Sequence, residues 1–151
     1  MAKFVFKMQN ILEVKLKLED QAKSAYATAI AILEAEKEKH RLLEIRKDGY
    51  EEQLTSIMRA SLQITEICRL EDAVEVMKYR IQAQMVMVRN AELQVKKAQK
   101  MLQDAMVERK TYEKLKEKAF EEFKQEMNAQ EKKEIDELVS YKFSTKKEEV
   151  V

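Results

Sequence analysis

Apolar side chains recur along the chain in alternating steps of four and three residues, the heptad spacing that forms one seam along a coiled-coil helix. A first series of seam positions consists of Met8, Leu12, Lys15, Glu19, Ala22, Tyr26, Ala29, Leu33, Glu36, His40, Leu43, Lys47, Tyr50, Leu54 and Ile57. A second series consists of Leu70, Val74, Met77, Ile81, Gln84, Val88, Ala91, Val95, Ala98, Leu102, Ala105, Arg109, Tyr112, Lys116, Ala119 and Phe123. The two series predict two long helices.

The stretch between the two series, "MRASLQITEICR" (58–69), breaks both registers. Ser61 and Thr65 are residue types that cap helix starts, and Glu66 favours a helix N-terminus nearby. We therefore expect the chain to reverse here and to form an all-α, antiparallel two-helix coiled-coil hairpin in a single domain. Its expected parts are a first helix at about 3–58, a turn region at about 59–69, a second helix at about 70–143 and a short tail at 144–151.

Gly49 is the other candidate for a turn. The seam formed by Leu43, Tyr50 and Leu54 runs through it without a break. We interpret Gly49 as a glycine inside the first helix, which costs about 1 kcal/mol relative to alanine.

Side-chain volume suggests how the two helices are aligned. One register sets Leu12 against Ala119, Tyr26 against Ala105, Ala29 against Leu102, Leu33 against Ala98 and His40 against Ala91. Large residues then face small ones, which fills a close interface without voids. A shift by one heptad is nearly as good, so the sequence leaves these two registers open.

The second seam ends after Phe123, since its next positions are Glu126, Gln130, Lys133 and Glu137. The N-terminal start of the first helix lies at the same level. Residues 124–143 therefore have no partner within the chain and form an overhang of roughly 30 Å. Phe120 lies beside the seam, where Phe4 or Phe6 can reach it.

Composition agrees with long helices and narrows the possible functions. The 151 residues include no proline and one glycine, and 38% are charged. The 29 basic and 28 acidic residues are interleaved. No basic stripe of the kind that neutralises phosphates is present, which argues against nucleic acid as a partner.

Nothing in the sequence predicts catalysis, a cofactor or a metal. One histidine and one cysteine do not make a zinc site, and a lone glycine does not make a phosphate-binding loop. His40 occupies a seam position, where packing is the simpler interpretation. We therefore expect a protein that is not an enzyme.

The start "MAKFVFKMQN" has no signal-peptide core, and the run "AYATAIAIL" is about half the length that spans a bilayer. The single Cys68 cannot form an internal disulfide, which suits the cytoplasm. We expect a cytoplasmic protein without direct membrane insertion.

Both ends of the chain resemble a known family. The opening "FVFKMQNILEVK", with Phe4, Phe6, Gln9 and Leu12, is similar to the start of FliJ, the coiled-coil component of the flagellar type III export apparatus. The closing "ERKTYEKLKEKAFEEFKQEMNAQEKKEIDEL" resembles the family's C-terminal signature. The matching residues there are Glu108, Lys110, Glu113, Lys114, Leu115, Asp136 and Glu137. The resemblance covers nearly the whole chain.

The resemblance implies an antiparallel coiled coil similar to the central stalk of rotary ATPases. The implied partners are the hexameric flagellar export ATPase, the export gate membrane protein and export chaperones, at the inner face of the cell membrane. Candidates for contact with the ATPase are Phe120, Met127, Ile135, Leu138 and Val139. The family's gate contacts are spaced four, three and four residues apart early in the second helix, and Leu70, Val74, Met77 and Ile81 have this spacing.

Two other functions remain open. One is a generic coiled-coil scaffold, in which two hairpins associate without an ATPase. The other is a stalk subunit of an ion-translocating rotary ATPase, for which the chain is short and lacks a globular portion. The sequence does not identify the chaperones, the stoichiometry or the oligomeric state.

Overall fold

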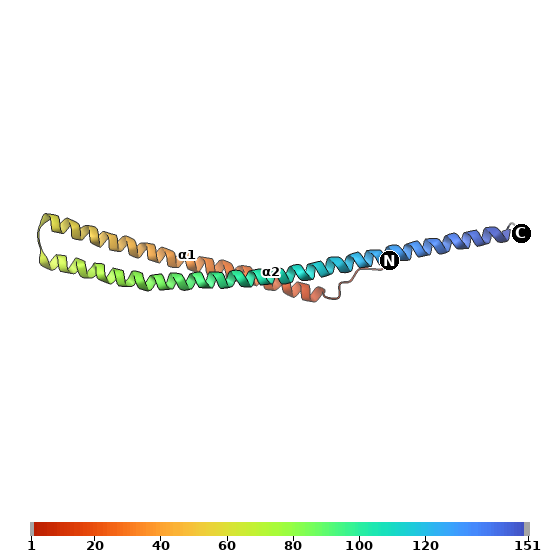
Figure 1. Ribbon diagram of the computed structural model, residues 1–151, viewed down its shortest axis with the longest axis horizontal. Coiled ribbons are helices and arrows are strands. Elements are labelled where there is room, and N and C mark those ends of the chain that lie inside the picture. Colours follow the sequence, from red (N-terminus) through yellow and green to blue (C-terminus); the bar gives the residue numbers. More distant parts are fainter. Residues whose placement is uncertain (1, 150–151) are drawn as a thin grey trace. The chain divides into compact units, whose positions relative to one another are not determined.

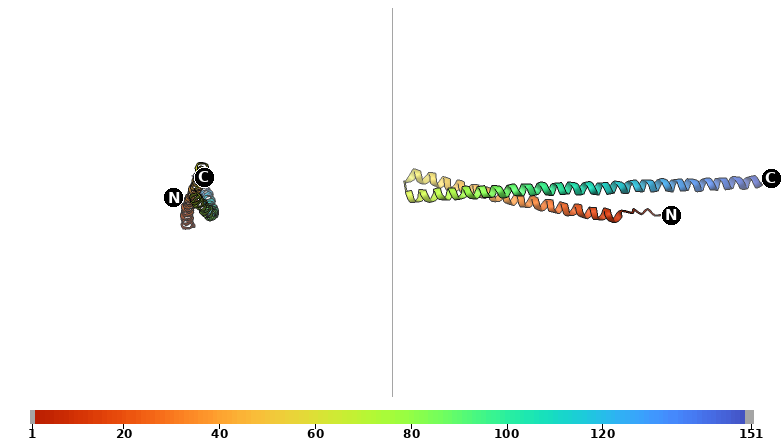
Figure 2. Two further views of the ribbon diagram at one scale, coloured as in Figure 1. Left: turned by 90° about the vertical axis from the view of Figure 1, so that its left-hand side faces the viewer. Right: turned by 60° about the horizontal axis from the view of Figure 1, so that its bottom comes forward.

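The computed structural model describes residues 2–149, which form two helices, α1 (Gln9–Ala60) and α2 (Ile64–Glu149). A linker of three residues, 61–63, reverses the chain between them (Figure 1). Near this linker α1 passes from one side of α2 to the other, as helices of a coiled coil do (Figure 2). The predicted all-α two-helix hairpin is confirmed.

The described chain divides into two compact units. One unit comprises Glu19–Ala105 and includes the linker. The other comprises the residues before Glu19 and those after Ala105. Each unit contains a stretch of α1 and a stretch of α2.

The predicted seam is confirmed in both units. Every position of both series is buried or half-buried. The buried apolar side chains are Phe6, Leu12, Leu70, Val74, Met77, Ile81 and Ala91. Burial of one narrow stripe on each helix is what holds such a hairpin together, because single helices in water gain little from propensity alone.

The two helices pair in the second of the two possible registers, which is shifted by one heptad from the register that sets Leu33 against Ala98. In the unit with the linker, the Gln84 amide donates a hydrogen bond to the Glu36 backbone oxygen at 2.9 Å. The register that sets Leu33 against Ala98 would place Glu36 level with Val95. That is eleven residues from Gln84, or about 16 Å along α2. The shifted register places Glu36 level with Val88, about 6 Å along α2 from Gln84, or about one helical turn.

The other unit leads to the same result. The Lys15 ammonium is 2.7 Å from a Glu108 carboxylate oxygen and 5.9 Å from the centre of the Tyr112 ring. The first register would have placed Lys15 level with Lys116. In the shifted register Leu12 is level with Tyr112 instead of Ala119.

The position of the linker explains the shift. The turn region was expected at 59–69, but α2 already begins at Ile64. The Ile67 amide donates to the Gln63 backbone oxygen at 3.0 Å, and the Ile67 side chain is half-buried. Leu54 and Leu70 then lie equally far from the centre of the linker at Leu62, so these two seam positions face each other.

Both outer helix ends also differ from the prediction. α1 begins at Gln9 instead of about residue 3, and α2 continues past residue 143 to Glu149. The expected tail at 144–151 is therefore helical as far as it is described. Residues 150 and 151 lie outside the described residues.

Gly49 lies inside α1 with an ordinary helical backbone, which confirms its interpretation as a mid-helix glycine. A Cβ atom added at this position would meet no atom within 4 Å. We expect Gly49→Ala to raise the free energy of unfolding by about 0.5–1 kcal/mol, because alanine loses less backbone entropy on folding. Urea unfolding followed by circular dichroism measures this change. Ala27→Gly, at an exposed position of α1, should lose a similar amount, and a destabilised Gly49→Ala variant would contradict the prediction.

Candidate functional site

The chain before α1 packs against α2 through aromatic side chains. We call residues 2–8 the N-terminal strap. Phe4 meets Phe120 edge-on, with ring centres 5.2 Å apart, and lies 5.5 Å from the Phe123 ring. Phe6 is buried. The expected contact of Phe4 or Phe6 with Phe120 is thus confirmed for Phe4.

The strap shields α2 from solvent as far as Met127. Ala2 lines a groove with Met127, Gln130, Glu131 and Glu134, and Met127 is half-buried. Every residue from Asn128 to Ser144 is exposed. The overhang therefore begins at Asn128 instead of Lys124. The reason is that residues 2–6 are not helical, and a non-helical chain advances up to about 3.3 Å per residue against 1.5 Å in a helix.

The overhang carries large apolar side chains that are exposed to solvent. Ile135, Leu138 and Val139 are each about 60% exposed. Leu138 follows Phe120 by about five complete helical turns, so both side chains lie on the same side of α2. Met127 and Ile135 lie on this side too, within about 60° of it. We call Phe120, Met127, Ile135 and Leu138 the apolar stripe of α2.

The structure thus brings four of the five ATPase-contact candidates onto one side of α2. Val139 is about 100° away around the helix, at the flank of the stripe. Phe120 remains 41% exposed beside the strap, and the Lys124 ammonium lies 5.0 Å from the centre of its ring. The stripe is therefore an apolar surface in two parts, one beside the strap and one beyond it.

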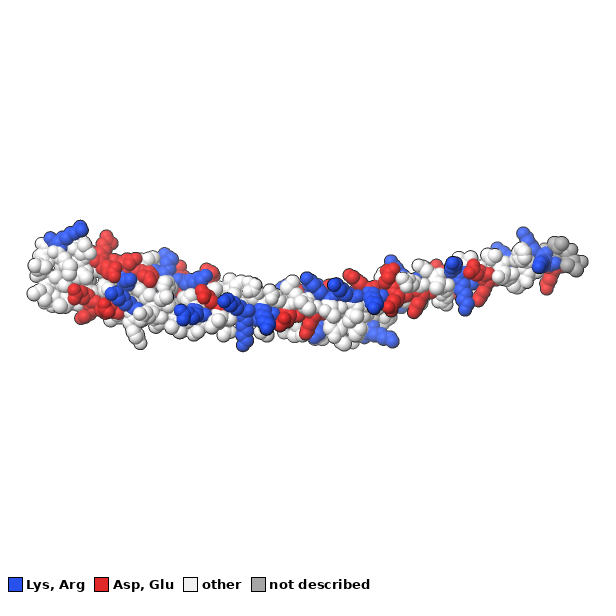
Figure 3. Space-filling view, in the orientation of Figure 1, with Lys and Arg blue, Asp and Glu red and all other residues white. Residues whose placement is uncertain are grey.

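Charges of both signs surround these surfaces. Blue and red side chains alternate along the visible face without a large area of either sign (Figure 3). The hydrogen bond from Lys15 to Glu108 raises the pKa of the lysine above its usual value. In the other unit, the hydrogen bond from Gln84 holds the pKa of Glu36 below its usual value. These polar contacts link α1 to α2.

The four gate-contact candidates are core residues of the unit with the linker. Leu70, Val74, Met77 and Ile81 are at most 7% exposed. A partner can reach these side chains only if the two helices separate locally. Their contact with the gate stays a prediction, whereas their packing in the seam is what the structure describes.

A second series on α2 has the same spacing and is accessible. Tyr79, Ala83, Val86 and Asn90 are spaced four, three and four residues apart, and all four are exposed. Tyr79 is 75% exposed. This series lies outside the seam and is not among the candidates predicted from the sequence. Its signal in the sequence is the helical spacing of Tyr79, Ala83 and Val86 away from the seam.

Neither helix of the described chain is long and apolar enough to cross a membrane. Within residues 2–149 no three His, Cys, Asp or Glu side chains are grouped as metal ligands would be.

Known proteins resemble this chain over nearly its whole length. Residues 4–148 match the family described as Flagellar FliJ protein. The flagellar FliJ protein of Bacillus subtilis (strain 168) is 28% identical over 138 residues, which cover 89% of this chain and 92% of that protein. A solved structure, described as that of a putative YscO homolog, CT670, from Chlamydia trachomatis, has a TM-score of 0.52 at 22% identity. It covers 97% of this chain and 99% of its own, and at this identity it shows a shared fold.

The match at 4–148 includes all of α1, α2 up to residue 148, and the strap from Phe4 onward. Since it spans far more than half of the sequence, the chain belongs to the FliJ family of flagellar proteins.

Proposed function

We propose that this protein is a stalk and adaptor of flagellar protein export. Membership of the FliJ family makes it a component of flagellar export in general. The proposed partners are the hexameric export ATPase, the export gate membrane protein and export chaperones, at the cytoplasmic face of the cell membrane. The observation that carries the proposal is the exposed outer part of the apolar stripe, Ile135 and Leu138, on an overhang that no other described part of the chain covers.

The overhang has the properties of a helix that is completed by a partner. Residues 128–144 are exposed all round, and a single helix of this length is marginal in water. Ile135 and Leu138 lie on one side of it, as the anchors of an amphipathic helix do when it enters an apolar groove. The resemblance to a rotary-ATPase stalk makes the ATPase ring the natural source of this groove.

Serine substitution tests the ATPase contact. We expect Ile135→Ser combined with Leu138→Ser to weaken binding of the purified export ATPase about a hundredfold, because two apolar side chains lose their burial. Phe143→Ser is the matched control. Phe143 is 66% exposed, close to the 61% of Leu138, but lies about 140° away around the helix. Full affinity of the double variant would refute the contact.

The gate contact belongs on an accessible surface. Tyr79, Ala83, Val86 and Asn90 combine the spacing of the family's gate contacts with exposure. They lie on the same part of α2 as the four seam candidates. We therefore propose this exposed series as the gate-binding face. The seam candidates lie on the opposite side of α2 and hold this helix against α1.

A pair of alanine variants separates the two series. Met77→Ala should lower the free energy of unfolding by about 2–4 kcal/mol, because Met77 is buried. Tyr79→Ala should change it by no more than about 0.5 kcal/mol but should weaken binding to the purified gate domain. Both quantities are measurable by urea unfolding and by calorimetric titration. If Met77→Ala reduces the gate affinity of the folded protein and Tyr79→Ala does not, the seam series makes the contact.

Co-purification distinguishes the proposal from its two alternatives. An export stalk retains the export ATPase, a generic scaffold retains only further copies of itself, and a rotary-ATPase stalk retains that enzyme. The absence of the export ATPase under conditions in which the hairpin is folded would count against the proposal.

A further inference from the structure

We propose that the N-terminal strap is an internal competitor for the apolar stripe of α2. It occupies the half of the stripe next to α1 and has to leave before a partner can take the whole surface. This inference rests on the proposed ATPase contact and adds a regulatory step to it.

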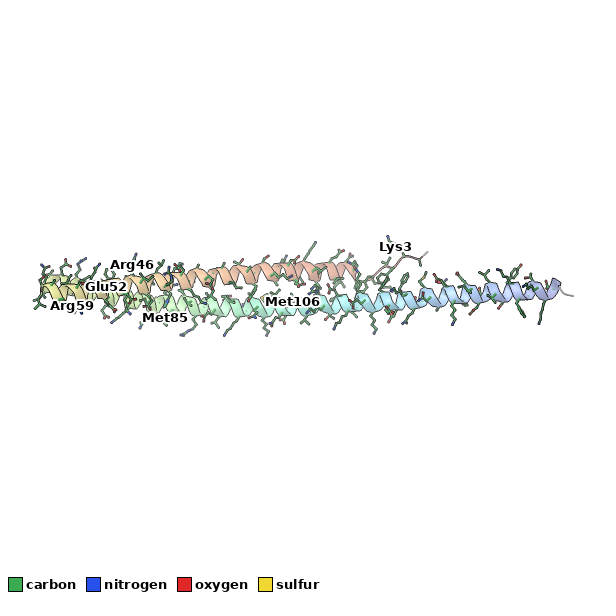
Figure 4. All side chains as sticks on the ribbon, turned by 90° about the horizontal axis from the view of Figure 1, so that it is seen from above. Lys3, Arg46, Glu52, Arg59, Met85 and Met106 are labelled. Atoms are coloured by element: carbon green, nitrogen blue, oxygen red, sulfur yellow. The ribbon has the colours of Figure 1, made fainter. Side chains whose placement is uncertain are left out.

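The strap is seated by side chains that alternate along it. Phe4 and Phe6 are on the inner side of the strap. Phe4 packs against Phe120 and Phe123 of α2, and Phe6 is buried. Val5 between them is 76% exposed. Lys3 is exposed too and is labelled at the strap in Figure 4. The strap therefore binds through one face, as an apolar peptide ligand would.

The strap and the proposed partner use one continuous surface. Phe120 and Met127 lie beside the strap, whereas Ile135 and Leu138 lie beyond it on the same side of α2. A partner groove that receives Ile135 and Leu138 and continues toward α1 meets Met127 next. There the groove would overlap with Ala2 and then with Phe4.

The strap is suited to detach without disturbing the helices. Residues 2–6 form neither helix nor strand, so packing of side chains is their main attachment to α2. The turn at Lys7 and Met8 joins them to α1. The Gln9 amide donates to the Phe6 backbone oxygen at 3.2 Å, which fixes the point from which the strap departs.

A competitor of this kind lowers affinity without changing the partner's contacts. For contacts that need an open strap, the apparent affinity equals the affinity of the open molecule multiplied by the fraction of molecules in which the strap is open. A molecule with a closed strap offers Ile135, Leu138 and the exposed part of Phe120, and one with an open strap offers all four stripe residues in full.

A reversible cross-link tests this directly. In a Cys68→Ser background, Ala2→Cys and Gln130→Cys place thiols at two residues that line the same groove. A short bis-methanethiosulfonate reagent closes the strap, and a reductant opens it. We expect the cross-linked protein to bind the purified export ATPase about tenfold more weakly than the reduced protein. Gln130→Cys capped with a monofunctional reagent controls for the bulk of the linker and should bind normally.

Substitutions in the strap provide the opposite change. Phe4→Ala should loosen the strap and raise the affinity for the ATPase about tenfold, since it removes the contacts with Phe120 and Phe123. Val5→Ala, at the exposed position of the same segment, should leave the affinity unchanged.

The possible results distinguish a failure of strap competition from a failure of the proposed ATPase contact. Equal affinity of the cross-linked and reduced proteins, with ATPase bound in both states, overturns the strap as a competitor and leaves the ATPase contact intact. A weaker complex after Phe4→Ala also overturns it, because the strap would then be part of the binding surface. Absence of ATPase binding in every variant refutes the proposed function and the inference together.

Discussion

Replacing Leu70 with alanine is expected to lower the free energy of unfolding of the hairpin by about 3 kcal/mol. Leu70 is only 1% exposed, and it lies in the seam close to the linker. In the observed register it faces Leu54, so truncation leaves a cavity between two large side chains that cannot collapse easily. Urea unfolding followed by helical circular dichroism measures the loss.

Leu62→Ala provides the matched control. Leu62 is the same residue type eight positions earlier, but it is 79% exposed in the linker. Its truncation should change the free energy of unfolding by no more than about 0.5 kcal/mol. If the two variants unfold at the same urea concentration, the helices do not pack at this level and the observed register is wrong.

Deleting residues 128–151 is expected to abolish association with the export ATPase while leaving the melting of the hairpin almost unchanged. The deleted helix contributes no buried side chain between Asn128 and Ser144, so its removal costs little packing energy. It does remove Ile135 and Leu138, which carry the proposed contact. Thermal melting by circular dichroism and calorimetric titration with the ATPase measure the two effects.

A longer deletion serves as the control. Removing residues 119–151 also takes away Phe120 and Phe123, the partners of Phe4. This variant should melt at a lower temperature than the first one. Equal melting of both, or a large loss after the shorter deletion, would show that the overhang packs on its own chain.

The seam could be predicted position by position because it depends on local spacing. A heptad pattern identifies the buried side of a helix whatever its partner is. The register could not be predicted in the same way. Both candidate registers set Leu33 against an alanine, Ala98 in one and Ala91 in the other, so packing volume does not choose between them.

The linker decided the register, and its signal in the sequence is weak. No glycine or proline marks the reversal at 61–63. Ile67 was the available clue, since it extends the second seam by three residues before Leu70. Counting Ile67 as a seam position moves the start of α2 toward Ile64 and centres the turn near Leu62.

The candidate site was predictable where it depended on one helix and not where it depended on a non-helical segment. The exposure of Ile135, Leu138 and Val139 follows from the end of the seam. The cover over Met127 does not, because its extent depends on the conformation of residues 2–6. The buried position of the gate candidates follows from the seam itself, whereas the exposed series at Tyr79 lies on the opposite side of α2, where the heptad pattern makes no prediction.

The short linker also limits how the lengths of such proteins can change during evolution. Seven residues inserted into α1 alone would slide every seam position beyond the insertion past its partner by about two turns of helix, unless seven more were inserted at the matching level of α2. Insertions and deletions between the linker and the strap should therefore occur as compensating pairs, placed symmetrically about Leu62. Beyond Asn128 the hairpin imposes no such pairing, because that part of α2 has no stretch of α1 beside it.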